Sequence, residues 1–127
     1  MTSVFCKNIE KLTLKNKSYR NVLYTNPKGM QFVLMSLKVN EEIGMEKHNN
    51  IDQFIKVESG MGQLHIMKDD IIKKYKLEDG FGWYYHTKPS KTFHNIINTG
   101  VKELKLYTVY SAPDHEDGLI QRNKNIE

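Results

Sequence analysis

The feature that most constrains the fold of this chain is a series of short apolar runs, spaced regularly and separated by glycine, asparagine and proline turns. Within most runs apolar and polar residues alternate, as expected of strands that bury one face. None of the runs shows sustained helical periodicity. Many short strands with tight turns are typical of an all-β sandwich or barrel. The runs lie at residues 9–14, 19–24, 30–39, 52–58, 63–67, 71–77, 81–86 and 103–110, with a further run after Pro89.

Two segments refine this prediction. The run at residues 30–39 is apolar on both faces, which is typical of a strand in the interior of a sandwich. Lys68-Asp69-Asp70 lies between two runs and predicts the turn of a hairpin.

The chain has 127 residues, the size of one ordinary domain. We therefore expect a single domain spanning residues 1–127, with its core at about 8–112. The remaining residues, 113–127, form a polar tail. From Gly118 onward this tail is expected to be a short helix or disordered.

Composition limits the possible partners and compartments. The single cysteine, Cys6, excludes an intrachain disulfide, and residues 1–11 lack the apolar core of a secretory signal, so we expect a cytoplasmic protein. The net charge is +4, but the lysines are scattered and form no basic stripe with stacking aromatics. We therefore expect no nucleic-acid partner, and the ordinary hydrophobic content of 39% indicates no membrane partner.

Four residues are candidates for a metal site. Glu46 and His48 are two residues apart, so on an extended chain both side chains project from the same side, roughly 7 Å apart along the backbone. Gln53 lies in the next run, on a face that can point inward. His94 lies on one face of the run after Pro89 and supplies a further ligand.

The spacing of these residues resembles the first motif of the cupins, which are jelly-roll β-barrels. That motif is a glycine, His-x-His, a glutamate a few residues later and a further glycine. Counting back from Gly60 puts Gln53 at the place of the glutamate. His48 then stands at the second histidine and Glu46 at the first.

A second cupin motif, Pro-x-Gly-x-x-His-x-x-x-Asn, is matched by Pro89, His94 and Asn98, with Lys91 at the glycine position. The sequence is therefore similar to the small single-domain cupins over most of its length, from about Asn8 to Gly118.

The resemblance implies a divalent transition metal, Fe, Mn, Ni or Zn, held by Glu46, His48, Gln53 and His94. Because Glu46 and Gln53 replace a histidine and a glutamate, the set comprises one carboxylate, two imidazoles and one amide. This set is close to the two-His-one-carboxylate arrangement that suits Fe(II), Mn(II) or Ni(II). Gln53 is a weaker, neutral ligand, and Asp52 is the alternative carboxylate if the strand register slips.

The function predicted from these residues is that of a metal-binding cupin, a metal-dependent oxygenase or isomerase acting on a small oxygen-bearing metabolite. The alternative is a non-catalytic cupin module that binds a small ligand. Face parity alone places Gln31, Met35 and Tyr85 in the wall that would contact this substrate. Resemblance to small cupins also implies a homodimer formed through sheet edges.

Overall fold

The structure is a computed structural model that describes residues 4–46, 51–86 and 92–124, with backbone alone for Tyr85 and His86. These residues form one helix and nine strands. The elements are α1 (Ile9–Lys15), β1 (Arg20–Thr25), β2 (Gln31–Leu37), β3 (Asp52–Ser59), β4 (Met61–Lys68), β5 (Ile71–Glu78), β6 (Gly82–His86), β7 (Thr92–Asn98), β8 (Leu104–Tyr110) and β9 (Ile120–Gln121).

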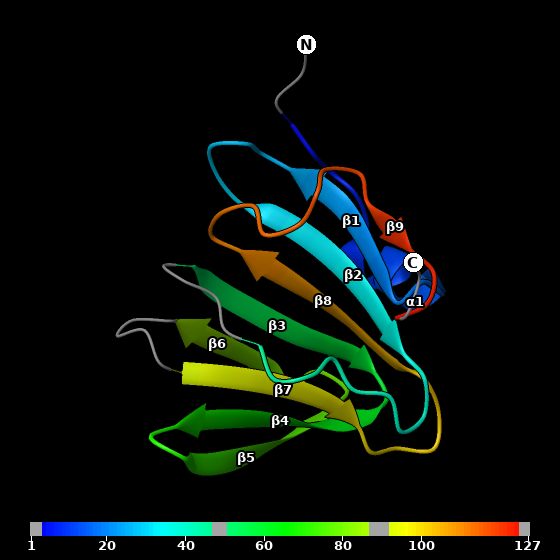
Figure 1. The fold of residues 1–127 in the computed structure, drawn as a ribbon. Helices are drawn as coiled ribbons and strands as arrows, with labels where there is room; N and C mark the ends of the chain where they lie inside the picture. The colour runs from blue at the N-terminus through cyan, green and yellow to red at the C-terminus, as the bar shows by residue number, and fades with distance from the viewer. Residues whose placement is uncertain (1–3, 47–50, 87–91, 125–127) are drawn as a thin grey trace.

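The strands form two antiparallel sheets (Figure 1). One has six strands in the order β6-β3-β8-β2-β1-β9, and the other has three in the order β5-β4-β7. Buried side chains of both sheets share one core, in which Leu64 and Ile96 of the smaller sheet join Ile55 and Leu106 of the larger. The prediction of an all-β fold is confirmed, as is the burial of β2 on both faces.

The chain between β2 and β3 lies along β7. Ile43 N donates to Ile96 O at 2.9 Å, and Glu46 forms an antiparallel bridge with His94. In Figure 1 this segment runs back across the molecule from the end of β2 toward β7. It therefore extends the smaller sheet beyond β7 and brings Glu46 to the side of a buried strand.

The prediction of a strand at residues 9–14 is wrong, because these residues form helix α1. The side chain of Asn8 caps the helix by accepting a hydrogen bond from Lys11 N at 3.0 Å. The partly or fully buried residues of α1 are Ile9, Leu12 and Thr13, which are spaced as residues on one face of a helix. A run of six residues is too short for its apolar pattern to distinguish a strand from a helix, and the Asn8 cap favours the helix. No helix of the described residues is long and apolar enough to span a membrane.

The two tight reversals on either side of β4 follow from backbone conformation. The predicted hairpin at Lys68-Asp69-Asp70 is confirmed: Asp69 and Asp70 have φ of 53° and 62°, as a type I′ turn requires. Gly60 joins β3 to β4 with φ of 105°, and a Cβ there would lie 2.7 Å from Glu103 O. Glycine is therefore required at that position.

The tail beyond Gly118 differs from the expected short helix or disordered segment. Ile120 and Gln121 form β9, which pairs with β1 at the edge of the larger sheet. The guanidinium of Arg20 donates to the side chain of Gln121 at 2.7 Å. A two-residue strand has too little sequence to show alternation, so its pairing partner decides its structure.

Candidate metal centre at one end of the barrel

The predicted site residues lie at one end of the two sheets. In Figure 1, β3, β5 and β7 begin, and β4, β6 and β8 end, on the left side of the view. Gln53 is the second residue of β3 and His94 the third of β7, so both lie near this end. Tyr110 is the last residue of β8 and lies there as well.

His94 occupies the interior face of β7. Its side chain is buried, with 2% of its surface exposed, and Ile96 on the same face belongs to the core. Glu46 is paired directly opposite His94: Glu46 N donates to His94 O at 2.7 Å, and His94 N donates to Glu46 O at 2.8 Å. Side chains of such a pair project from the same face of the sheet. The carboxylate of Glu46 is therefore directed to the side of the buried imidazole.

Asn95 holds the Glu46 segment in place. Its side-chain oxygen accepts a hydrogen bond from Gly44 N at 2.7 Å, and its amide nitrogen donates to the carboxylate of Glu42 at 3.1 Å. Gly44 has φ of 101°, a conformation that other residues rarely adopt. The bend at Gly44 and the Asn95 bonds together fix the register that sets Glu46 against His94.

The carboxylate of Glu46 interacts electrostatically with two buried tyrosines and raises the pKa of both. Burial raises the pKa of Tyr110, and the carboxylates of Asp114 and Glu46 add to this increase. Burial also raises the pKa of Tyr19; Arg20 opposes that increase and Glu46 adds to it. These tyrosines belong to the core, which indicates that the Glu46 carboxylate lies on the interior side of its segment.

Gln53 faces the same interior from β3. It is 4% exposed, and its Nε2 donates to Thr108 Oγ1 on the adjacent strand β8 at 2.8 Å. Its Oε1 is buried and accepts no hydrogen bond from any residue that the structure describes. The amide is therefore fixed through its nitrogen, while its oxygen is left to accept from, or coordinate, something else.

Asp52, the alternative carboxylate, faces the other way. It accepts a hydrogen bond from the Tyr84 hydroxyl at 2.5 Å, and Tyr84 is 64% exposed. Since successive residues of a strand alternate faces, Asp52 lies on the outer face and Gln53 on the inner face. The structure thus brings Gln53, rather than Asp52, to the interior.

Three of the four predicted ligands, Glu46, Gln53 and His94, therefore belong to elements that meet at this end of the barrel. His48 lies outside the described residues. Within the described residues, no group of three or more His, Cys, Asp or Glu side chains is placed to hold a metal ion. Glu46 and His94 are two such residues, and Gln53 contributes an amide, so a third acidic or imidazole ligand would have to come from a side chain outside the described part, where the predicted ligand His48 lies.

The predicted substrate wall is described in part. Gln31 is fully buried, and its amide donates to Thr25 Oγ1 and His115 O and accepts from the backbone of Asp114 and His115. These bonds tie the chain after β8 to β2. Met35 is 2% exposed and packs in the core. Tyr85 has a described backbone in register with Gln53, but its side chain lies outside the described part. A role in substrate contact stays a prediction for all three.

Sequence reasoning missed the residues that support the candidate ligands. Thr108 holds the Gln53 amide, and Tyr110 lies next to it on the interior face of β8. The alternation of Leu104, Leu106 and Thr108 placed Thr108 on one face with the core leucines, so a signal was available. The contact itself depends on strand register, which alternation does not supply.

The residues present fit a divalent transition metal. Imidazole nitrogen, carboxylate oxygen and amide oxygen are all ligand types that Fe, Mn, Ni and Zn accept. The buried Oε1 of Gln53, without a described hydrogen-bond donor, is the kind of atom that a bound cation satisfies.

Comparison with known proteins gives two relatives by sequence, while no protein-family model matches the chain. The uncharacterized protein YrkC of Bacillus subtilis (strain 168) is 37% identical over 127 residues, which cover 94% of this chain and 63% of YrkC. The uncharacterized protein L612 of Acanthamoeba polyphaga mimivirus is 40% identical over 118 residues, which cover 92% of this chain and 71% of L612. The chain thus spans less than two thirds of the length of YrkC.

Solved structures agree with this relationship and show the fold. BH2720 from Bacillus halodurans matches with a TM-score of 0.87 and 36% identity over 94% of this chain and 89% of its own. The cupin domain of Schizosaccharomyces pombe Cnp3 matches with a TM-score of 0.62 at 10% identity, over 72% of this chain and 62% of its own. A predicted oxalate decarboxylase from Thermotoga maritima matches with a TM-score of 0.62 at 21% identity, over 74% and 79%. The chain therefore has the cupin fold and belongs to the family that includes L612 and BH2720.

Proposed function

We propose that this protein is a metal-dependent cupin enzyme, an oxygenase or isomerase that acts on a small oxygen-bearing metabolite. The observation that carries the proposal is the side chain of Gln53. Its oxygen is buried in the barrel without a donor among the described residues, in the interior that His94 also faces. Leaving such an acceptor unsatisfied costs about 1–3 kcal/mol. A cation bound between Gln53 and His94 would remove this cost.

Four side chains would hold the metal, whether Fe, Mn, Ni or Zn: Glu46, His48, Gln53 and His94. When bound, such an ion polarises an oxygen of the substrate and stabilises negative charge on it, or activates dioxygen. Glu46 would neutralise one of the two positive charges, and the remaining charge favours an anionic or enolate oxygen.

The surrounding residues of the chain position these ligands. Thr108 orients the Gln53 amide at 2.8 Å, and Asn95 fixes the backbone before Glu46. The high pKa of buried Tyr110 keeps its hydroxyl protonated at neutral pH. This hydroxyl lies 3.4 Å from His115 Nε2, so it would act on a substrate oxygen only as a hydrogen-bond donor shared with His115, and not as an anion. Burial of His94 keeps bulk water away from the same space.

A second candidate function is a non-catalytic module that binds a small ligand in the barrel. The observation that favours it is again Gln53, because a neutral amide replaces the carboxylate of the usual motif and binds metal more weakly. A barrel without a resident metal would use Gln53, Tyr110 and His94 as hydrogen-bonding groups for the ligand.

Metal analysis of purified variants tests the proposal. We expect about one transition metal per chain in the wild type, measured by inductively coupled plasma mass spectrometry. Glu46→Gln and His94→Ala should lose this metal. Asp52→Asn is the matched control, since it removes a carboxylate at the same end of the barrel but on the outer face, and it should keep its metal.

The activity of the metal-loaded protein separates the two functions. Oxygen uptake or isomer formation with a panel of hydroxy, keto and enol substrates would support the enzyme. Stoichiometric metal without turnover would favour the binding module. A wild type that binds no transition metal even when it is supplied would overturn the metal-dependent function.

A further inference from the structure

We propose that the groove at the mouth of the barrel binds the carboxylate group of an anionic small molecule through Lys73 and Lys68. The ligand would lie on an apolar floor beside His94. This inference deepens the proposed function and rests on it for one point: the reacting part of the ligand lies toward His94, which adjoins the groove as the neighbour of Ile66.

Strand register places Lys73 beside the candidate metal centre. Ile66 of β4 pairs with Lys73 of β5 on one side and with His94 of β7 on the other. Paired residues of adjacent antiparallel strands project from the same face, so Lys73, Ile66 and His94 form one row on the interior face of the smaller sheet. With strands about 4.8 Å apart, the Cα atoms at the two ends of the row are about 10 Å apart. A small molecule bound at His94 is therefore within reach of the Lys73 side chain.

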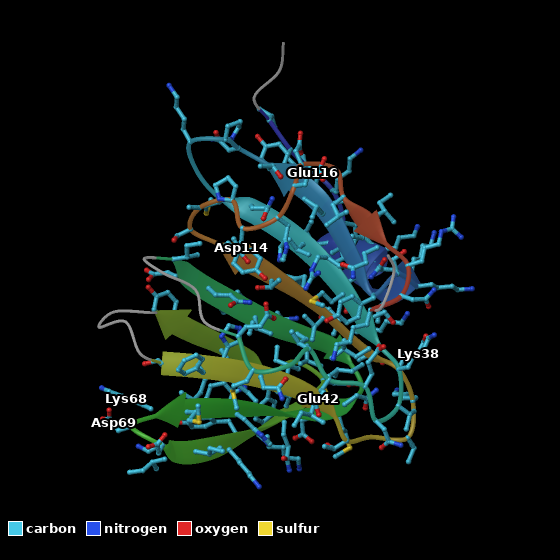
Figure 2. All side chains as sticks on the ribbon, viewed as in Figure 1. Lys38, Glu42, Lys68, Asp69, Asp114 and Glu116 are labelled. Atoms are coloured by element: carbon cyan, nitrogen blue, oxygen red, sulfur yellow. The ribbon has the colours of Figure 1, made fainter. Side chains whose placement is uncertain are left out.

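A second row lies one step closer to the mouth. Lys68 pairs with Ile71 of β5 and Thr92 of β7, and it has the same strand parity as Ile66. Figure 2 shows Lys68 at the end of β4, at the edge of the molecule. The two lysines thus lie on the same face in successive rows, Lys73 deeper and Lys68 outside it.

The members of these rows other than His94 line a groove of about 400 Å³, to which Ile66, Ile71 and Tyr75 contribute apolar surface. His94 adjoins the groove as the neighbour of Ile66 on β7. Ile71 is 65% exposed, which leaves a large aliphatic side chain in contact with water. Covering such a surface is favourable by roughly 25 cal/mol per Å² of apolar area removed from water. The groove therefore suits a ligand with an alkyl or aryl body in addition to its charged group.

The charges of the groove favour a carboxylate. Lys68 and Lys73 contribute two positive charges, and Asp69, which also lines the groove, contributes one negative charge. Neither lysine forms an ion pair with another residue that the structure describes. The net charge of one positive unit matches a monocarboxylate, and both ammonium groups have donors left for its oxygens.

Lys74 offers a matched control for Lys73. It follows Lys73 on the same exposed strand, but it pairs with His65 on the outer face of the sheet. Desolvation lowers the pKa of His65, and the charge of Lys74 lowers it further, in agreement with this placement. Lys73→Gln and Lys74→Gln therefore remove the same charge from opposite faces of one strand.

The test is a titration of ¹⁵N-labelled protein with benzoate, followed by NMR in the metal-free and Zn²⁺-loaded forms, with benzamide and inorganic phosphate as comparison probes. We expect benzoate to shift the amide signals of Ile66, Ile71 and Lys73 more than those of the outer-face residues. Lys73→Gln should weaken benzoate binding about tenfold, the loss of one charge-assisted contact. Lys74→Gln should change it less than about twofold.

Three results would overturn the inference: benzamide binding as tightly as benzoate, equal effects of Lys73→Gln and Lys74→Gln, or phosphate binding in place of benzoate. The metal-free titration separates this failure from failure of the proposed function. Lys73-dependent benzoate binding to a protein that takes up no metal would leave the groove intact and remove the metal centre. A protein that binds Zn²⁺ but not benzoate would support the metal centre and overturn the inference about the groove.

Discussion

Glu46 and His94 form a directly opposed antiparallel pair, joined by reciprocal backbone hydrogen bonds of 2.7 and 2.8 Å. The pair sets a carboxylate from the chain between β2 and β3 on the same side as a buried imidazole from β7. Backbone pairing, rather than a free loop, determines their relative position. Residues that hold this pairing should therefore control metal binding without contacting the metal.

Asn95→Ala tests this dependence. Removing the side chain breaks the bonds to Gly44 N and Glu42, so the segment that carries Glu46 loses its register. We expect metal affinity to fall about 10- to 100-fold, the usual effect of removing a group that orients a ligand. Isothermal titration with Zn²⁺ measures the change. His65→Gln, its cross-strand neighbour on the outer face, is the control and should retain the wild-type affinity.

Gln53→Glu should strengthen metal binding and lower the stability of the metal-free protein. A carboxylate at this buried position is costly without a cation, and it becomes a better ligand when a cation is present. In thermal unfolding, the metal-free variant should have a lower Tm than the metal-free wild type. Added Mn²⁺ or Zn²⁺ should raise the Tm of the variant by more than it raises the Tm of the wild type. An equal metal-induced shift in both proteins would mean that residue 53 does not contact the ion.

Asn98→Ala should destabilise the fold and leave metal chemistry unaffected. Asn98 is fully buried, its amide donates to Leu37 O and Lys102 O at 2.9 Å, and its oxygen accepts from Gly100 N at 2.9 Å. Loss of these bonds leaves buried backbone groups unsatisfied, at a cost of about 2–4 kcal/mol in the free energy of unfolding. Urea denaturation measures it, with Thr99→Ala at the exposed neighbouring position as control.

The stability of the protein should fall at alkaline pH because of Tyr110. Burial raises its pKa above the ordinary value of 10.0, so above that pH the unfolded chain releases a proton that the folded chain retains. The free energy of unfolding then decreases by about 1.4 kcal/mol per pH unit for this one group. Tyr110→Phe should lessen this decrease by roughly 1 kcal/mol between pH 10 and 11 and by nearly the full amount per pH unit above pH 11. An unchanged slope in Tyr110→Phe would show that Tyr110 does not retain its proton.

Alternation within single strands accounts for what could be predicted. It placed Gln53 on the face opposite Asp52 and His94 on the face opposite Asn95, and the structure has these residues on those faces, because side chains of a strand alternate regardless of its neighbours. It failed at residues 9–14, because six residues are too few for apolar–polar alternation to exclude a helix, and there Ile9, Leu12 and Thr13 form the buried face of a helix capped by Asn8.

Relations between strands could not be predicted in this way. The pairing of Glu46 with His94, the bond from Gln53 to Thr108 and the row from His94 to Lys73 each join residues far apart in the chain. These contacts depend on register, which the core as a whole selects and no local pattern encodes. Lys73 in particular has no feature that distinguishes it from Lys74 until the sheet is assembled.

The most direct test of the account is a crystal structure of the protein grown with Mn²⁺ or Zn²⁺, with anomalous scattering data. We predict one anomalous peak in the barrel interior, at about 2.0–2.3 Å from a ring nitrogen of His94, from Gln53 Oε1 and from a Glu46 oxygen. An interior without such a peak, or a peak bound away from Gln53 and His94, would contradict it.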